Sequence, residues 1–213
     1  MAEQGTRTVE RALSLLAVVC DRGEVTLALA ARYTELSPST ALRLLRTLES
    51  NGFVRKDHDN NYHPGSRVMQ IGARALSNES LVKISDNTMN HLVDQTGESA
   101  YLSVRGHNST ALYINIHEGT HSVRHTSWVG RSVELRSSAA GQVLLGQTQA
   151  DGFVIVERGI EPDVTAIAAP ISSGGRVVAA LSLVIPSYRV NEIQAVEYGN
   201  LVRIAAQSIS TVL

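Results

Sequence analysis

The sequence predicts an α+β protein with an N-terminal winged helix-turn-helix, a linker helix, and a C-terminal antiparallel sheet with flanking helices. Three observations predict this fold. Apolar residues recur with helical spacing up to residue 50, the period changes from 3.6 to 2 after Asn51-Gly52, and about six strand-like runs follow residue 98 before a last helical stretch. The expected boundaries of the three parts are 6–64, 65–78 and 79–213.

Three helices are expected in the first 50 residues. The first runs from about Thr8 to Cys20, and the second from about Leu27 to Thr34 with Thr26 as its cap. The third runs from Pro38 to about Ser50, because Ser37 is a favourable N-cap and proline suits the first helical position. The residues expected to pack inward are Val9, Ala12, Leu13, Leu15, Leu16 and Val19 of the first helix and Ala41, Leu42, Leu44, Leu45 and Leu48 of the third.

A two-stranded hairpin is expected next. Residues 53–56 and 61–63 flank Asp57-His58-Asp59-Asn60, a cluster of turn-forming residues. Two helices, a three-residue turn, a third helix and a hairpin follow one another as in a winged helix-turn-helix.

The remaining elements are predicted from the same signals. A linker helix should bury Val68, Ile71, Ala75 and Leu76, and a helix from Leu81 to Gln95 should follow the break at 77–80. The expected strands are 99–105, 111–117, 121–128, 153–157, 165–171 and 176–185, with a helix starting at 138 and another over 191–212.

Composition excludes several classes of protein. The 213 residues are 43% apolar, which is enough for packed cores. The longest apolar run, 177–185, is half of the roughly 20 residues that cross a bilayer, and the first residues lack the apolar segment of a signal peptide. We therefore expect a cytoplasmic protein with no membrane partner. The single cysteine, Cys20, is expected to be a buried thiol.

The exposed face of the third predicted helix suits a DNA major groove. Residues 7–76 carry a net charge of +3, whereas residues 77–213 carry −3. We expect Ser39, Thr40 and Arg43 to read base edges and Arg46 to meet phosphate, with Ser37 and Thr47 on the same face. The hairpin offers Arg55, Lys56 and His63 to the DNA backbone or minor groove, and Arg7 lies just ahead of the first helix. The predicted partner is double-stranded DNA. RNA is not expected, because the sequence shows no exposed pair of aromatic residues on a sheet, on which RNA bases stack.

Several motifs in order resemble the IclR-type bacterial transcriptional regulators. They are Thr8–Leu16, Thr26–Ala30 and Ser37–Val54 in the first half, and Val129–Leu135, Ser138–Leu145 and Val177–Ser182 with Pro186 in the second. The resemblance implies a GAF/PAS-like effector domain and a homodimer or homotetramer that binds an operator as a repressor or an activator. It also implies control by a small-molecule effector, expected to be a carboxylic acid.

The resemblance also implies an effector pocket. Backbone amides at Ser138, Ala139 and Ala140 match the stretch that meets the ligand carboxylate. The matching wall positions are His125, Val133, Val156, Ala166, Ser182 and Val184. Trp128 lies between His125 and Val133 in the sequence, and an aromatic acid is expected to pack against Trp128 or Tyr101. Val156 and Val184 stand where a member that binds small polar acids has an acidic residue and a serine, which favours a larger or aromatic acid. Ordinary core packing is an equally good interpretation of each valine and alanine.

One departure from the family lies near residues 146–151. Family members have some tens of mostly helical residues after the helix that matches 138–145, and this chain has only Gly146–Asp151 before the next strand. Either the segment is deleted or the sequence omits it. We expect omission, because deletion would uncover one face of the sheet.

Two other functions stay open from the sequence alone. His117-Glu118-Gly119-Thr120-His121 fits the zinc-protease pattern HExxH, which needs both histidines on one helix face. Here the pattern straddles a glycine-containing turn between strand-like runs, so we expect no metal, no cofactor and no catalytic residue. The alternatives are a metal-dependent hydrolase in the C-terminal domain and a winged-helix interaction module that does not bind DNA.

Overall fold

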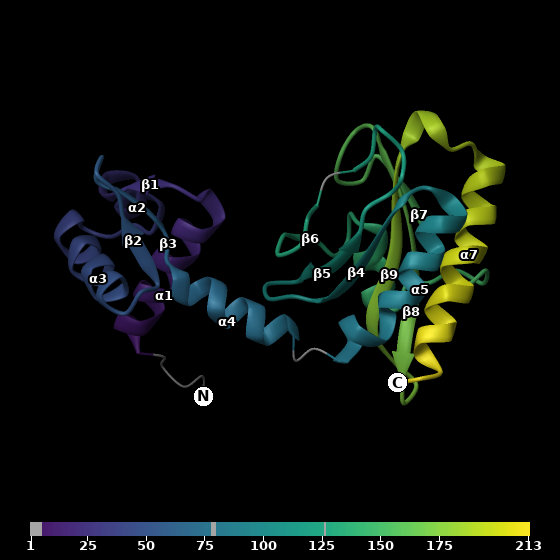
Figure 1. The fold of residues 1–213 in the computed structure, drawn as a ribbon, viewed down its shortest axis with the longest axis horizontal. Coiled ribbons are helices and arrows are strands. Elements are labelled where there is room, and N and C mark those ends of the chain that lie inside the picture. Colours follow the sequence, from purple (N-terminus) through teal and green to yellow (C-terminus); the bar gives the residue numbers. More distant parts are fainter. Residues whose placement is uncertain (1–5, 78–79, 126) are drawn as a thin grey trace. The chain divides into compact units, whose positions relative to one another are not determined.

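The computed structural model of the chain describes residues 6–77, 80–125 and 127–213. The chain divides into two compact units, Met1–Asn78 and Glu79–Leu213 (Figure 1). Each unit has its own buried apolar core. The expected break between linker and second domain falls partly on residues 78 and 79, which lie outside the described residues. Among the described residues, no helix has the length and apolar character that crossing a bilayer requires.

The N-terminal unit is a winged helix-turn-helix, as predicted. Its helices are α1 (Arg7–Arg22), α2 (Leu27–Tyr33) and α3 (Pro38–Ser50). The oxygens of Thr26 and Ser37 accept hydrogen bonds from the amides of Leu29 and Thr40, so both expected N-caps form. A three-stranded sheet has the order β1-β3-β2, with β1 at Val25–Thr26, β2 at Val54–Lys56 and β3 at Asn61–Pro64. The sequence did not predict β1, because it is only two residues long.

The core of this unit lies between α1, α3 and the sheet. Leu15, Val19, Leu45 and Tyr62 are almost fully buried in it. The prediction that Val9 and Leu13 pack inward is wrong, since they are 54% and 59% exposed. The apolar face of α1 is wider than the surface that α3 and the sheet cover. Cys20 is half-buried rather than buried, and desolvation together with the nearby Asp21 raises its pKa.

Helix α4 (Ser66–Ser77) follows the hairpin directly. The amide of Arg67 donates to the carbonyl of Gly52, which anchors the start of α4 on the end of α3. The expected burial of Ile71 and Leu76 is wrong within this unit, where they are 46% and 39% exposed. Helix α4 is held to the unit at its start, so the apolar side chains of Ile71 and Leu76 farther along it stay exposed.

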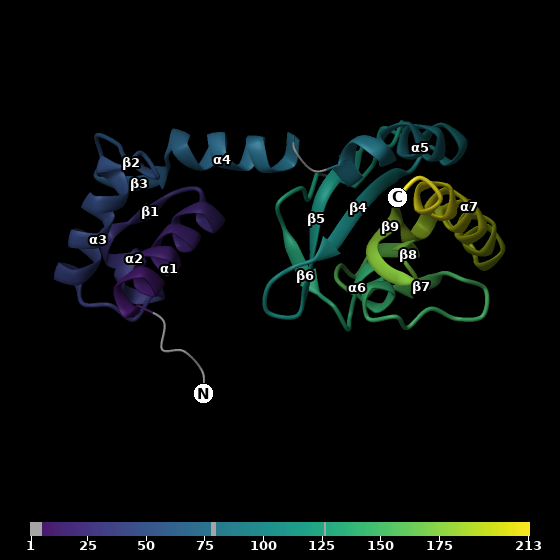
Figure 2. The ribbon, with the colours of Figure 1, turned by 90° about the horizontal axis from the view of Figure 1, so that it is seen from below.

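The C-terminal unit contains one six-stranded antiparallel sheet with helices on it, which confirms the predicted α+β class (Figure 2). The strand order is β6-β5-β4-β9-β8-β7. The strands are β4 (Ser99–Arg105), β5 (Thr110–His117), β6 (Ser132–Glu134), β7 (Val154–Glu157), β8 (Val164–Ser173) and β9 (Arg176–Pro186). The helices are α5 (Ser80–Thr96), α6 (Ala139–Leu144) and α7 (Glu192–Ser210), with a 3₁₀ turn η1 at Ser187–Arg189.

The strand predicted over 121–128 is wrong. The described residues there, 121–125 and 127–128, form a loop, and the edge of the sheet is β6 instead. The rings of His125 and Trp128 pack against each other with centroids 4.5 Å apart. A strand would place residues three apart on opposite faces of the sheet, so this contact requires the loop.

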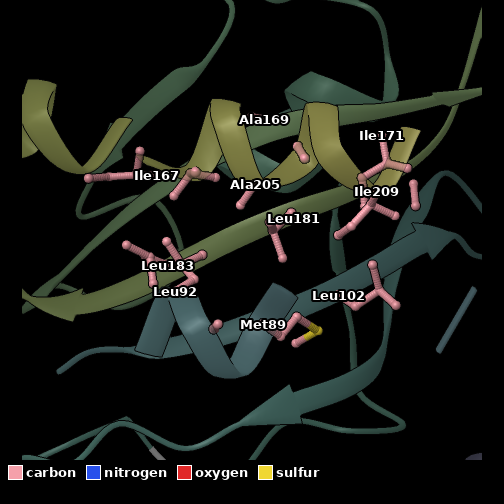
Figure 3. Close-up of a cluster of buried hydrophobic side chains, with 14 of the residues drawn as sticks. Met89, Leu92, Leu102, Ile167, Ala169, Ile171, Leu181, Leu183, Ala205 and Ile209 are labelled. Carbon is pink, nitrogen blue, oxygen red and sulfur yellow. The ribbon is translucent and has the colours of Figure 1, made fainter. Parts of the chain in front are cut away.

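The two faces of the sheet carry different layers. Helices α5 and α7 cover one face, where Met89, Leu92, Leu181, Leu183 and Ile209 form the main core (Figure 3). The other face carries α6 and a second buried cluster. Strand β9 contributes to both faces because successive side chains alternate across a strand. Along the outer side of α7, Ile193, Val196 and Ile204 remain exposed.

Candidate DNA-reading face and ligand pocket

Four of the predicted DNA-binding side chains form one exposed surface on α3. Ser39, Arg43, Arg46 and Thr47 lie together with Leu42 and Ser50 around a shallow open hollow. The spacing of these residues by three, four and seven positions explains why they share a helix face. We refer to Ser39, Arg43, Arg46 and Thr47 as the reading face.

Two predicted DNA contacts, Ser37 and Thr40, already form hydrogen bonds with each other. The Ser37 hydroxyl accepts from the Thr40 amide at 3.3 Å and donates to Thr40 Oγ1 at 2.9 Å. Thr40 is also half-buried. These hydroxyls therefore order the first turn of α3. The hydroxyl of Ser39, an exposed residue in the same turn, lies 3.2 Å from that of Ser37.

The hairpin presents only two of its three predicted contacts. Arg55 and Lys56 are exposed on β2. His63 does not project toward a partner: its Nε2 lies 2.6 Å from Oδ2 of Asp57 and its Nδ1 lies 3.1 Å from the carbonyl of Gly23. Both ring nitrogens of His63 therefore face acceptors within the unit, and its contact with DNA stays a prediction. Arg7 is exposed, but it lies in the first turn of α1 rather than ahead of it.

Asp57 organises the hairpin tip. The sequence predicted only that Asp57 is one of the turn-forming residues there. Its Oδ1 accepts from the amides of Asp59 and Asn61, while Oδ2 faces His63. The hydrogen bond with His63, followed by the backbone hydrogen bonds, lowers the pKa of Asp57. Glu24 joins this group through a 2.7 Å hydrogen bond from Asn61, so the polar network ties β1 to the hairpin.

The two histidines of the protease-like pattern, His117 and His121, and the nearby His125 have separate partners. His117 contacts Asn90 and Asp86 of α5 at 2.6 and 2.9 Å. His121 Nε2 lies 3.6 Å from Oε1 of Glu98. His125 Nδ1 lies 2.6 Å from the hydroxyl of Tyr101. Within the described ranges, the residues that could jointly ligate a metal are Glu24, Asp57 and His63 in the other unit.

The C-terminal unit has a pocket on the α6 side of the sheet. Its lining residues are Tyr113, Trp128, Ser137, Ser138, Ala139, Val156, Gly159, Ile160, Glu161, Val164, Ala166 and Val184. The hollow measures about 340 Å³ including its open mouth, but only about 20 Å³ can hold the centre of a water molecule. The enclosed part of the pocket is therefore very small, and most of the 340 Å³ lies at its open mouth.

The lining includes six of the residues expected at the effector site. They are Trp128, Ser138, Ala139, Val156, Ala166 and Val184. The other five lie behind or beside the pocket in the buried layer: Tyr101, His125, Val133, Ala140 and Ser182. The sequence did not single out the loop residues Gly159, Ile160 and Glu161, because a loop closing over a pocket has no periodic signal.

The rings of Tyr101, Tyr113 and Trp128 pack together at the pocket, and we refer to them as its aromatic floor. Tyr101 and Tyr113 pack edge to face at 5.2 Å, and Trp128 lies 5.7 Å from Tyr113 and 4.5 Å from His125. Burial raises the pKa of Tyr113 to about 12 and that of Tyr101 further still, so both phenols keep their protons. A Tyr101 hydroxyl that donates to Nδ1 of His125 leaves the imidazole hydrogen on Nε2, which lies 3.4 Å from Oε2 of Glu161.

Helix α6 begins at the pocket with a formed cap. The Ser138 hydroxyl accepts from the amide of Gly141 at 3.1 Å and donates to the carbonyl of Glu134 at 2.8 Å. A Cβ on Gly141 would overlap the backbone of Leu135, so glycine permits this close approach. Because the Ser138 hydroxyl is already used, the polar groups of this turn left for a ligand are backbone amides.

The geometry of both units agrees with known proteins. A family model described as the IclR helix-turn-helix domain matches residues 8–58, and one described as the bacterial transcriptional regulator IclR C-terminal domain matches 73–153 and 144–211. The transcriptional regulator KdgR of Escherichia coli is 25% identical, covering 95% of this chain and 91% of KdgR. The E. coli transcriptional repressor AllR is 26% identical, covering 100% of this chain and 92% of AllR.

Solved structures share the fold. An IclR transcriptional regulator from Alicyclobacillus acidocaldarius aligns with a TM-score of 0.84 at 19% identity, covering 98% of this chain and 99% of that protein. An IclR homologue from Microbacterium hydrocarbonoxydans, solved with 4-hydroxybenzoate, aligns with a TM-score of 0.79 at 22% identity, covering 96% and 98%.

The comparisons also locate the departure near residue 146. The two matches to the C-terminal family model meet around residues 144–153. The alignment with AllR extends over 251 positions, whereas this chain has 213 residues. In the structure, turns at 145–153 connect α6 to β7 directly.

Proposed function

The chain belongs to the IclR family of bacterial transcriptional regulators, and from this premise we propose that residues 6–64 bind operator DNA while residues 79–213 bind a small organic acid. The α4 segment, 65–78, would connect the two functions. We further propose that the protein acts in the cytoplasm as a homodimer or homotetramer without catalysing a reaction. Exposed apolar side chains on α1, α4 and α7 support an oligomer, since each is left uncovered within its own unit.

The observation that carries DNA binding is the pair Arg43 and Arg46 on the reading face. Both arginines are exposed one turn apart on a capped helix, with Arg55 and Lys56 exposed on the adjoining hairpin. Arginine can contact guanine edges bidentately or phosphate, and a helix fits the width of the major groove. We propose that Ser39 and Arg43 contact bases and that Arg46, Arg55 and Lys56 contact phosphate.

The pocket supports an effector with an apolar body. Val156, Ala166 and Val184 contribute aliphatic walls, and Trp128 and Tyr113 contribute aromatic ones. We propose an aromatic or similarly apolar acid whose carboxylate meets the first amides of α6. The 4-hydroxybenzoate bound by the Microbacterium relative supports this class of ligand. Because the enclosed space is about 20 Å³, the effector must displace lining groups when it binds.

Selection of duplexes from a random DNA pool at about 100 mM salt tests this function, because sequence-independent phosphate binding weakens steeply with salt. We expect enrichment of a palindrome, and we expect 4-hydroxybenzoate to change the affinity for it. The double variant Arg43→Ala, Arg46→Ala should enrich no site. Arg105→Ala, which removes an exposed arginine from β4 in the other unit, should enrich the same site as the unmodified protein.

The result that would overturn the proposal is the absence of any enriched sequence, with and without the acid. That outcome would favour the interaction module. Hydrolysis of ester or peptide substrates that is lost in His117→Ala would favour the hydrolase, although His117 is occupied by Asp86 and Asn90.

A further inference from the structure

The loop between β7 and β8 closes over the ligand pocket. Its ends are held together by a 2.8 Å hydrogen bond from the amide of Arg158 to the carbonyl of Val164. Between them, Gly159, Ile160 and Glu161 line the pocket. We refer to residues 159–163 as the lid.

The lid packs tightly against the segment before α6. A Cβ on Gly159 would overlap the carbonyl oxygen of Ser137 and a methyl group of Val156, so only glycine allows this approach. Arg158 adopts a φ of 56°, a conformation that is uncommon for a residue with a side chain. The small enclosed space of the pocket follows from this closed arrangement.

Glu161 is the one charged side chain among the described residues that line the pocket. Its Oε2 lies 3.4 Å from Nε2 of His125, and the Glu161 side chain is 44% exposed. His125 in turn is buried and held by the hydroxyl of Tyr101 and the ring of Trp128. The carboxylate of Glu161, on a surface loop, therefore lies beside a buried imidazole that other groups hold in place.

We propose that Glu161 is an internal competitor for the effector, because its carboxylate lines the same pocket in which the carboxylate of the acid would meet the first amides of α6. This inference rests on the proposed binding of an organic acid. Two carboxylates a few ångströms apart in a partly buried site repel each other strongly. An acid can therefore bind only when Glu161 leaves His125, and its departure opens the lid.

The variant Glu161→Gln tests the lid without any ligand. The loss of the negative charge should speed hydrogen–deuterium exchange of peptides covering the lid by about threefold or more. The matched control is Glu157→Gln, because Glu157 is exposed at the end of β7 and does not line the pocket. Exchange of the lid in the control should equal that of the unmodified protein.

A titration with benzoate tests the competition. Trp128 is the only tryptophan in the sequence and lines the pocket, so its emission reports occupancy. Glu161→Gln should lower the Kd for benzoate by about three- to tenfold, whereas Glu157→Gln should leave it unchanged.

The outcomes separate the two proposals. Unchanged lid exchange in Glu161→Gln would overturn the internal competitor whatever the titration shows. Weaker benzoate binding by Glu161→Gln would also overturn it, since Glu161 would then be a ligand contact for a hydrogen-bond donor. Faster lid exchange with no benzoate binding to either protein would keep the contact between Glu161 and His125 and count against the acid effector.

Discussion

The imidazole of His63 lies between the carboxylate of Asp57, 2.6 Å from Nε2, and the carbonyl of Gly23, 3.1 Å from Nδ1. Asp57 is in the tip of the hairpin, His63 is on β3, and Gly23 follows α1. This one side chain therefore joins the hairpin to the helical part of the DNA-binding unit. The proposed backbone contacts of Arg55 and Lys56 depend on the hairpin position that this contact maintains.

The first prediction concerns the pH dependence of this contact. The pKa of Asp57 is lowered from its usual 3.8 in the folded protein, so the ionised carboxylate stabilises the fold above that value. The contribution is lost as the pH falls through the lowered pKa. We expect the difference in thermal midpoint between the unmodified protein and Asp57→Asn to shrink as the pH falls from about 5 to about 3. Circular dichroism melts at each pH measure it.

Asp59→Asn is the matched control for this prediction. Asp59 is an exposed acidic residue in the same turn, and the contact recorded for it with Asp57 uses its backbone amide rather than its carboxylate. A pH-dependent difference of the same size for Asp59→Asn would assign the effect to the general charge of the tip instead of the contact with His63.

The second prediction concerns the reading face. Arg43→Ala should weaken binding to the selected operator by about 1–3 kcal/mol and relax the preference at one base pair. Arg46→Ala should weaken binding to all sequences similarly. It should also reduce the slope of log affinity against log salt concentration by about one. Fluorescence anisotropy over a range of salt concentrations distinguishes them. Equal effects on specificity from both variants would contradict the assignment of Arg46 to phosphate.

The extent to which the sequence predicted the structure differs between elements for physical reasons. Helix α3 was predicted within its observed bounds because Ser37 and Pro38 are local signals. The loop at 121–125 was mistaken for a strand because the packing of His125 on Trp128 is tertiary. In the same way, the polar character of His63 suggested DNA contact, but its partners Asp57 and Gly23 could be identified only from the fold.

For the pocket, too, some residues were predicted from the sequence and others were not. Resemblance to a family identified wall positions on strands, including Val156, Ala166 and Val184, because strand registers are preserved within a fold. It did not identify Ile160 or Glu161, since loops vary in length and sequence. The exposure of Val9 on α1 was also unpredictable, because a periodic apolar face does not tell how much of it another element covers.

The third prediction concerns a buried ion pair next to the loop that carries His125. Glu98 is 1% exposed, and Arg189 of η1 donates to its two oxygens at 2.6 and 3.2 Å. Arg189→Ala should lower the free energy of unfolding by about 3 kcal/mol, because it leaves a buried carboxylate without its main partner. Glu98→Gln in the Arg189→Ala background should restore part of the loss. Denaturant unfolding of the four proteins in this cycle measures the coupling.

The stability of the double variant Arg189→Ala, Glu98→Gln can contradict this prediction. If Glu98→Gln destabilises the Arg189→Ala protein further, the carboxylate is adequately held by other groups such as His121, which lies 3.6 Å away. The loss in Arg189→Ala would then come from its hydrogen bond to the carbonyl of Val123.

The fourth prediction compares two buried serines on neighbouring strands. Ser182 of β9 is 1% exposed, and its hydroxyl has no hydrogen-bond partner in the part of the chain that the structure describes. Ser103 of β4 is equally buried, but its hydroxyl donates to the carbonyl of Ala180 at 3.3 Å. Burying a hydroxyl without a partner costs about 1–3 kcal/mol, whereas a formed hydrogen bond contributes about 1 kcal/mol.

The two serine-to-alanine variants should therefore shift stability in opposite directions. Ser182→Ala should raise the free energy of unfolding by up to about 1 kcal/mol, and Ser103→Ala should lower it by about 1 kcal/mol. Urea unfolding of the ligand-free protein measures both. A loss of stability in Ser182→Ala equal to that in Ser103→Ala would mean that a buried water bonds to the Ser182 hydroxyl. Ser182 pairs with Tyr101 across the sheet, so such a water would lie beside the aromatic floor of the pocket.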